Sequence, residues 1–354
     1  MKIALLFDGA SALGARADVL ILETVDAVER VLAAEGNQVV RVPVQTDGRW
    51  IERVRRGKFD LAFNLCEGVD GIAELEPCVV AALELLDVPS TGASSWTTAL
   101  CLRKPLINSL LERLGLPVPR FAVARRGVPL PAVGFPAICK PPAEDASVGV
   151  EQRSVVRTGA KLTDRVGAMH ELWDEVLVQR FVDGREVNVG ILGDQTLPIA
   201  EILFDGMPKG MWRIVSYRSK WETGSDEDRG AVPRCPAEVE PALATELKRI
   251  ALAAWSAVGG TGYGRVDFRI DRAGRPWLLE VNANPDIAPD AGLARMARAA
   301  GLDYGALIRS VCERALAGRA PATTDARWAL AQHLSGVTVP GDPASLDLFA
   351  LGAQ

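Results

Sequence analysis

Histidine is scarce in this sequence, and its cysteines form no paired motif. Only His170 and His333 occur among 354 residues, so we do not expect a Ser-His or Cys-His nucleophile. The six cysteines include no CxxC pair. This spacing argues against structural zinc and a disulfide framework, and it indicates reduced, mostly buried thiols.

Long apolar runs and a charge excess are also lacking. No run approaches the length of a membrane span, and Asp8 ends the apolar start of the chain too early for a secretory signal. The net charge of -5 comes from interspersed acidic and basic residues, so nucleic acid and an anionic membrane are not expected partners. We expect a cytoplasmic protein, and a chain of 354 residues, 48% of them hydrophobic, is long enough for two or three domains.

The first hundred residues alternate between strand and helix patterns. The strand-like stretches IALLF, NQVVRVPV and KFDLAFNL are interspersed with helical patterns at about 17–35 and 74–86, which predicts a parallel sheet in an α/β fold. The loop after the first strand lacks the spaced glycines of a dinucleotide site. A helix predicted over about 97–114 then leads through the proline-rich GLPVPRF into a second unit.

The second unit begins with an apolar strand that ends at Lys140 and is followed by a loop with Ser147 and Gly149. Two further strand-like stretches, EVLVQRFVDGREVNVGIL and LPIAEIL, come next. Residues 205–232 show no periodicity and predict a long loop over a site, which we call the lid. Helices are predicted over about 241–258 and 292–316, and the alanine- and proline-rich tail is expected to be peripheral.

A polar hairpin is the most informative feature of the chain. The turn DRAGRP joins two stretches that alternate polar and apolar residues, so residues 264–284 predict an antiparallel hairpin. Residues two apart on a strand share a face, which puts Arg265 beside Asp267 and Glu280 beside Asn282. If Asp271 pairs with Pro276, Asp267 lies opposite Glu280 and Arg265 lies opposite Asn282.

These four side chains suit magnesium and phosphate. Magnesium takes oxygen ligands, usually one or two carboxylates together with phosphate, and an arginine nearby can hold a phosphoryl group. The alternative is a surface hairpin whose charges pair in water. Apolar residues on the opposite face, Val266 and Phe268, indicate instead a buried hairpin whose carboxylates need a cation or a hydrogen-bond donor.

The order of motifs resembles the ATP-grasp carboxylate-amine ligases and, within them, the D-alanine–D-alanine ligase group. The resemblance covers residues 3 to about 318 and rests on FNLCEG, VPSTGASSWTTALCLRKPLINSLLERLGLPVP, KPPAEDASVGV, VQRFVDGREVNVGIL, YRSKW, GRVDF and EVNANP. It implies an N-terminal parallel α/β domain at 1–103, two α+β ATP-grasp lobes at 104–186 and 187–319 that clamp the nucleotide, and a peripheral tail at 320–354. Related ligases are commonly dimers, which implies a homodimer.

The resemblance also implies the cofactors and most of the site. ATP and magnesium, with manganese as a substitute, are the implied cofactors. Each lysine alone has the alternative of a solvated side chain, but Lys140 precedes a Ser/Gly loop that suits phosphate. The residues matched to ATP are Lys104, Lys140, Ser147, Gln179, Arg180, Val182, Glu186 and Lys220; those matched to magnesium are Asp267, Glu280 and Asn282; those at the reacting groups are Arg265, Lys220 and Trp221.

The implied reaction transfers the γ-phosphate of ATP to a substrate carboxylate, after which an amine attacks the acyl phosphate and forms an amide. The protein supplies positioning and charge neutralisation. The small-molecule carboxylate and amine are the expected partners, and the lid is expected to exclude water that would hydrolyse the acyl phosphate.

The substrate end departs from the resembled family. The family's glutamate, serine and tyrosine around the first amino acid correspond to Ala17 or Asp18, to Ala146 and to Trp221, and two positions around the second amino acid correspond to Ala291 and Asp286. Because a serine can hold a carboxylate and an aspartate repels it, we expect a substrate other than D-alanine.

The nature of that substrate and two further readings stay open. Asp286 and Asp290 indicate an amine that lacks a carboxylate or carries extra positive charge, with a solvated loop or helix cap as the alternative. A genuine D-alanine–D-alanine ligase is the second reading. A non-catalytic nucleotide-binding protein is the third, and a complete set of phosphoryl-transfer residues argues against it.

Overall fold

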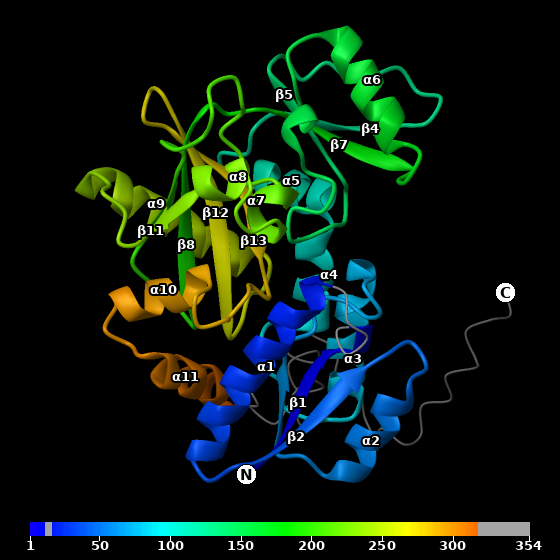
Figure 1. Cartoon of the computed structure of the whole chain (residues 1–354), viewed down its shortest axis with the longest axis vertical. Coiled ribbons are helices and arrows are strands. Elements are labelled where there is room, and N and C mark those ends of the chain that lie inside the picture. Colours follow the sequence, from blue (N-terminus) through cyan, green and yellow to red (C-terminus); the bar gives the residue numbers. More distant parts are fainter. Residues whose placement is uncertain (11–15, 318–354) are drawn as a thin grey trace, which may run out of the picture. The chain divides into compact units, whose positions relative to one another are not determined.

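The computed structural model describes residues 1–10 and 16–317, apart from the side chains of residues 16–20. Met1–Leu316 form one compact unit, and the described residues contain three sheets (Figure 1). We call these the N-terminal, the small and the large sheet. The side chain of Asp18 and the tail at 320–354 lie outside the described residues, so their predicted roles stay predictions.

The N-terminal sheet is parallel, as predicted, with β1 (Lys2–Asp8) between β2 (Gln38–Val44) and β3 (Leu61–Asn64). Because side chains alternate along a strand, β1 contributes to two cores. Ile3 and Leu5 belong to the core that includes α1 (Arg16–Ala34) and α11 (Tyr304–Ala317). Ala4 and Leu6 belong to the core that includes α2 (Arg49–Gly57), a helix the sequence analysis missed, and α3 (Glu76–Leu85), which follows a short 3-10 helix at Ala73–Leu75 (Figure 1).

Two predicted long helices are each broken in two, so those predictions were wrong. The helix expected at 97–114 is α4 (Ser95–Leu102) followed by α5 (Lys104–Arg113). Pro105 lies in the first turn of α5, where its missing N–H is tolerated, whereas in one continuous helix its ring would clash with the carbonyl of Cys101. The helix expected at 292–316 is α10 (Gly292–Ala299) followed by α11, and the break contains Gly301 with a φ of 86°.

The small sheet has the order β4-β7-β5-β6 and carries α6 against one face. Apolar residues of its strands pack with Leu162, Val166 and Met169 of the helix. A short 3-10 helix, Gln152–Ser154, precedes β6. The bounds are β4 (Phe121–Arg125), β5 (Ala137–Lys140), β6 (Val155–Val156), α6 (Gly159–Met169) and β7 (Glu175–Arg180).

The large sheet has the order β11-β10-β8-β12-β13, with β9 paired to β8. Its apolar face packs against α4, α5 and α9, and its other face carries polar side chains. The lid, expected to lack regular structure, contains two short helices, α7 and α8. The bounds are β8 (Gly184–Leu192), β9 (Gln195–Thr196), β10 (Ala200–Leu203), α7 (Tyr217–Trp221), α8 (Asp226–Gly230), β11 (Val232–Arg234), α9 (Pro241–Ala257), β12 (Tyr263–Asp271) and β13 (Pro276–Asn282).

The predicted hairpin is β12 and β13, but its register at the turn differs from the prediction. Ile270, and not Asp271, pairs with Pro276. A β-bulge follows, after which Asp267 pairs with Glu280 as predicted. A bulge adds one residue to one strand and shifts the side-chain alternation. Leu278 and Val281 can therefore both face the core, while Glu280 between them lines a cavity on the other side.

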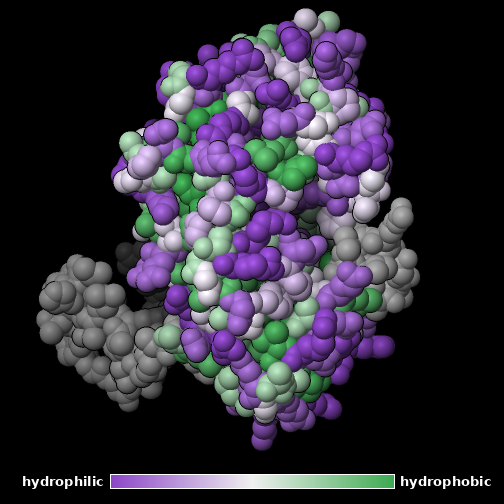
Figure 2. Space-filling model, turned by 60° about the vertical axis from the view of Figure 1, so that its left-hand side comes forward, coloured by the Kyte–Doolittle hydropathy of each residue, from purple (hydrophilic) through white to green (hydrophobic). Residues whose placement is uncertain are grey.

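The surface and the thiols agree with the composition. Hydrophilic residues cover most of the face in Figure 2, and hydrophobic residues form small patches among them. Within the described ranges, no helix is long and apolar enough to cross a membrane. All six cysteines are free, and four of them are buried, as the sequence predicted.

Candidate functional site

A cavity of about 460 Å³ lies beside the polar face of the large sheet and brings most of the predicted site residues together. Its walls come from the large sheet, the small sheet, the lid and the start of α5. Trp221 is not among its lining residues. The predicted residues that line it are Lys104, Lys140, Ala146, Ser147, Gln179, Arg180, Val182, Glu186, Lys220, Arg265, Asp267, Glu280, Asn282, Asp286 and Asp290.

The hairpin presents its oxygen atoms to this cavity. Arg265 donates to both carboxylate oxygens of Asp267, at 2.7 and 2.9 Å, and Asn188 of β8 donates to Asp267 Oδ1 at 2.7 Å. The amide oxygen of Asn282 accepts from the backbone N–H of Asn284 at 2.9 Å. The hydrogen bonds hold these side chains in defined positions on one wall.

Lys104 lies between two carboxylates. Its Nζ is 3.0 Å from Glu280 and 3.4 Å from Asp145, it also donates to the backbone carbonyl of Glu144, and the residue is only 9% exposed. Burial alone would raise the pKa of Glu280, but Lys104 and then Lys140 outweigh it and lower that pKa to about 2. Burial lowers the pKa of Lys104, and Glu280 and Asp145 outweigh it and raise the pKa above its ordinary value. Glu280 is therefore a carboxylate anion at neutral pH.

The donor set fits a hard divalent cation that also binds phosphate. In the described residues no three Asp, Glu, His or Cys side chains gather as a metal cluster. Asp267, Glu280 and Asn282 offer two carboxylates and an amide, the number that magnesium takes when phosphate supplies further oxygens. Both oxygens of Asp267 already accept from Arg265, so a cation there would share them with the guanidinium.

The loop after Lys140 has a backbone suited to close approach. Ala146 and Ser147 both have positive φ, 53° and 63°, in a turn closed by the Val148 N–H on the Asp145 carbonyl at 3.0 Å. A left-handed backbone is uncommon at residues other than glycine and costs about 1 kcal/mol or more at each. Burial lowers the pKa of the nearby Lys140, an effect that Glu280 opposes. We call residues 141–154 the phosphate loop.

The other end of the cavity contains a buried amide without a partner. Gln179 is 1% exposed, and neither its Oε1 nor its Nε2 forms a hydrogen bond with any described residue. An unsatisfied buried polar group costs about 1–3 kcal/mol, which a ligand with both a donor and an acceptor would relieve. The edge of an adenine base has both. Glu186 is 2.7 Å from Arg269, which fixes its carboxylate at the same end.

Two of the predicted substrate residues, Asp286 and Asp290, lie at the end of the cavity near α10. The N-cap of α10 is Ala291 and makes no side-chain cap, so Asp290 is not the helix cap that the sequence left open. Asp286 accepts from the backbone N–H of Ala288 at 2.8 Å. Arg295 also lines this end and donates to the Asp290 carbonyl at 2.7 Å. The end of the cavity near α10 is therefore lined by both carboxylates and a guanidinium.

Sequence reasoning missed Glu67 and Asp145. Glu67 and Asp286 line a smaller cavity of about 30 Å³, and Asp286 also lines the main one. The Glu67 side chain keeps contact with solvent, yet desolvation by the surrounding walls, and next the charge of Asp286, raises its pKa to about 7. Both residues stand inside informative motifs, FNLCEG and KPPAEDASVGV, but only the fold brings them to the site.

The comparisons with known proteins come from sequence and from structure. A family model described as D-ala D-ala ligase C-terminus matches residues 110–313. A D-alanine–D-alanine ligase of Bordetella avium is 32% identical over 69% of this chain and 75% of that protein. A ligase of the same name from Pelotomaculum thermopropionicum is 29% identical over 83% of this chain and 92% of that protein. An uncharacterized protein of Sinorhizobium fredii is 31% identical over 72% of this chain and 74% of that protein.

Solved structures show the same fold. The crystal structure of D-alanine–D-alanine ligase from Bacillus anthracis complexed with ATP covers 90% of this chain and 98% of its own, with a TM-score of 0.73 and 20% identity. Another structure of the ligase from that organism has a TM-score of 0.75 and 22% identity over the same shares. The predicted ATP-grasp architecture is confirmed.

Proposed function

Because the chain belongs to the D-alanine–D-alanine ligase family of ATP-dependent, ADP-forming ligases, we propose that it joins an amino-acid carboxylate to an amine through an acyl phosphate. One observation carries this proposal: Lys104, Lys140 and Arg265 reach the same cavity as the oxygens of Asp267 and Glu280. Phosphoryl transfer depends on positioning and charge neutralisation, and this set of residues supplies both.

Each wall of the cavity then has a task. The buried amide of Gln179 and the neighbouring strand residues Arg180 and Val182 read the adenine edge, and Glu186 lies beside the ribose. Lys104, Lys140 and the Ser147 turn hold the phosphates. The residues that would hold magnesium, or manganese in its place, are Asp267, Glu280 and Asn282. When bound, the ion neutralises phosphate charge.

The reaction takes two steps. A carboxylate oxygen of the first substrate attacks the γ-phosphorus and ADP leaves, while Arg265 and Lys220 offset the charge on the moving group. The amine of the second substrate then attacks the acyl carbon, loses a proton and displaces phosphate. The lid over the cavity excludes water, which would otherwise hydrolyse the acyl phosphate.

D-alanine is the first substrate to test on both sides of the reaction. The relatives from Bordetella avium and Pelotomaculum thermopropionicum have this substrate in their names, and Arg295 offers a cation that can hold a carboxylate. The names of the relatives thus favour D-alanine as the substrate more strongly than the altered substrate positions of this chain favour another amine. An amine without a carboxylate is the second candidate, favoured by Asp286 and Asp290 in the cavity wall and by the missing hydroxyl at Ala146.

The test is phosphate release that depends on magnesium and ATP, with product masses read by mass spectrometry. D-alanine alone is compared with separate pools of other amino acids and of amines. The mass of a D-alanine dipeptide supports the first candidate, and an amide from only another pool supports the second. If the protein binds ATP but releases no phosphate with any of the pools, the ligase proposal fails, and the result favours a non-catalytic nucleotide-binding protein.

We also propose that the chain forms a homodimer through α3, α4 and α5. Leu85, Trp96 and Leu106 on these helices are 89%, 71% and 56% exposed, and a cavity of about 320 Å³ lies beside Trp96. Trp96 and Leu106 line this cavity together, and a contiguous apolar patch of this kind favours burial against a partner. Sedimentation of the Trp96→Asp variant tests this: a dimer should dissociate, and an unchanged mass contradicts the interface. The cytoplasmic location stays a prediction, as do the domain bounds.

A further inference from the structure

The lid and the phosphate loop are joined by hydrogen bonds close to the cavity. The indole of Trp221 donates to the Ala146 carbonyl at 3.0 Å, and Ser147 Oγ donates to the Val215 carbonyl at 3.1 Å. The backbone N–H of Tyr217 donates to the Val150 carbonyl at 2.9 Å. These contacts fasten the part of the lid that carries Lys220, yet all of them use backbone carbonyls that many sequences could offer.

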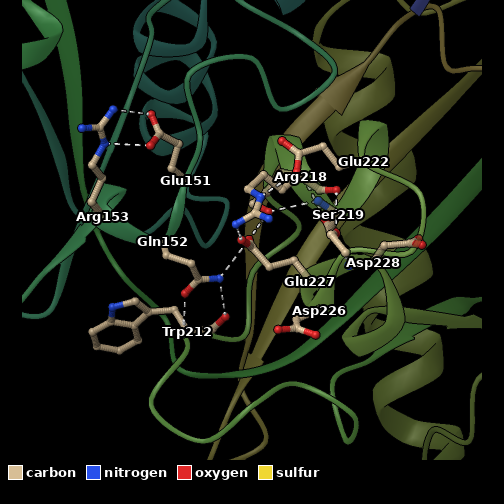
Figure 3. A network of polar contacts seen from close by, with 12 residues as sticks. Glu151, Gln152, Arg153, Trp212, Arg218, Ser219, Glu222, Asp226, Glu227 and Asp228 are labelled. Carbon is tan, nitrogen blue, oxygen red and sulfur yellow. Dashed lines mark hydrogen bonds and ion pairs between the residues drawn. The ribbon is translucent and has the colours of Figure 1, made fainter. Parts of the chain in front are cut away.

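Gln152 makes a more specific connection. Its Oε1 accepts from the Trp212 N–H at 2.6 Å, and its Nε2 donates to the Trp212 carbonyl and to Glu227 Oε2, both at 3.2 Å. Figure 3 shows Gln152 between Trp212 and Glu227, with Glu227 in turn facing Arg218. One amide from the phosphate loop thus satisfies groups from two parts of the lid.

Glu227 links Gln152 to α7, the helix that carries Lys220. Its carboxylate is almost fully buried, at 3% exposed, and it accepts from Ser216 Oγ, which has no exposed surface. Ser216 is the N-cap of α7, and its Oγ accepts from the Ser219 N–H at 3.2 Å. Lys220 is the next residue on that single turn of helix, so the position of Ser216 sets the position of the Lys220 backbone.

The side chain of Lys220 has no hydrogen-bonding partner of its own among the described residues. Its side chain lines the cavity and is exposed, and it forms no hydrogen bond or ion pair within the described ranges. An isolated helix of five residues is far too short to be stable in water. The order of this turn therefore depends on its capping and on its contacts with α8 and the phosphate loop.

We propose that Gln152 and Glu227 are positioning residues that hold Lys220 toward the transferred phosphate when the lid lies against the phosphate loop. The inference rests on the proposed function for the role of Lys220, and on the hydrogen bonds of Gln152, Glu227 and Ser216 for the connection itself. Gln152, Ser216 and Glu227 form what we call the lid bridge. It links the small sheet, where the nucleotide phosphates are expected, to the lysine that reaches them.

Two readouts test the bridge, and one of them does not depend on activity. We expect trypsin to cleave after Arg218 and Lys220 when the lid opens, because a protease needs a locally unfolded segment. In Gln152→Leu we expect cleavage at these bonds about tenfold faster, because a hydrogen bond to a charged group changes an equilibrium by about that factor. The second readout is the phosphate released per amide formed. We expect it to rise at least twofold as water enters, with kcat about tenfold lower and KM for ATP changed less than threefold.

The matched control is Asp226→Asn. Asp226 precedes Glu227 on α8 but is 62% exposed, and within the described part of the chain its ion pair is with the exposed Arg229, so both readouts should match the wild type. A rescue variant combines Gln152→Glu with Glu227→Gln. The exchange keeps one hydrogen-bond donor and one acceptor between positions 152 and 227. Gln152→Glu alone should lose protection from trypsin, and the double variant should regain at least half of that loss.

The outcomes separate the bridge from the ligase proposal. Wild-type cleavage and coupling in Gln152→Leu, in a protein whose circular dichroism is unchanged, would overturn the bridge. Failure of the exchange to recover protection would overturn the direct contact between Gln152 and Glu227. If no substrate pool supports turnover in the wild type, the proposed function fails, and the trypsin readout still decides whether the bridge holds the lid.

Discussion

Replacing Lys104 with methionine should destabilise the protein in a way that depends on pH. Lys104 is 9% exposed and lies 3.0 Å from Glu280 and 3.4 Å from Asp145. Removing the cation leaves two carboxylates in a desolvated place. Breaking a buried pair by removing one partner typically costs about 3–5 kcal/mol, and Lys140 nearby offsets a part, so we expect a loss of about 3 kcal/mol at pH 8.

The sign of the pH effect follows from the pKa of Glu280. Lys104 and Lys140 lower that pKa to about 2 from an ordinary value of 4.5. A lowered pKa contributes stability that is present above the unfolded value and is lost as the pH falls through the folded value. Without Lys104 the carboxylates take up protons at higher pH and become neutral. The difference between wild type and variant should therefore shrink, to about 1 kcal/mol at pH 5.

The assay is urea unfolding followed by tryptophan fluorescence, with chelator present, from pH 5 to pH 8. The control is Lys161→Met, because Lys161 is 73% exposed and 3.8 Å from Asp164, and its loss should stay within about 0.5 kcal/mol. Adding Asp145→Asn to Lys104→Met should recover about 1 kcal/mol at pH 8, since it removes one of the two charges. Equal losses at pH 5 and pH 8, or a loss under about 1 kcal/mol, would refute the reasoning.

Three further predictions concern the site. Glu280→Gln should lower magnesium-dependent turnover about a hundredfold or more with the circular dichroism unchanged, and a near-normal rate would remove Glu280 from the metal site. Glu67→Gln should be more stable than the wild type by about 1 kcal/mol at pH 8, a figure reduced for solvent screening, and equally stable below pH 4.5. The reason is that the pKa of Glu67 is raised to about 7 in the folded protein, so the wild type loses stability as the pH rises from 4.5 through 7. Urea unfolding at both pH values measures the difference in stability, and a difference that did not change with pH would contradict this prediction. Trp221→Tyr should not raise kcat/KM for D-alanine, because residue 146 still lacks a hydroxyl and the hydrogen bond from the Trp221 indole to the Ala146 carbonyl is lost. A tenfold rise in kcat/KM for D-alanine would mean that the missing hydroxyl at Ala146 matters little.

The sequence predicts the polar wall of the cavity because its signal is local. Alternation along two strands and a polar turn is enough to place Arg265, Asp267, Glu280 and Asn282 on one face. The predicted pairing at the turn was off by one residue, and the β-bulge beyond it restored the pairing of Asp267 with Glu280. A bulge has no clear signature in one sequence, so this part of the prediction succeeded despite a wrong premise.

Contacts between distant segments could not be predicted in the same way. Lys104 meets Asp145 and Glu280, and Gln152 meets Glu227, only because separate sheets and the lid come together. In isolation each of these residues looks like an ordinary surface charge or amide. The breaks in the long helices were different, since Pro105 and Gly301 were visible and their effect on a continuous helix is known.

The central claim is that a substrate carboxylate takes the γ-phosphate of ATP. It is tested most directly with a substrate whose carboxylate oxygens carry oxygen-18, D-alanine first and then whichever pool supports phosphate release. The account predicts that the phosphate released during amide formation contains one labelled oxygen from the carboxylate, because the acyl phosphate breaks on the carbonyl side. Amide formation with unlabelled phosphate would contradict the acyl phosphate.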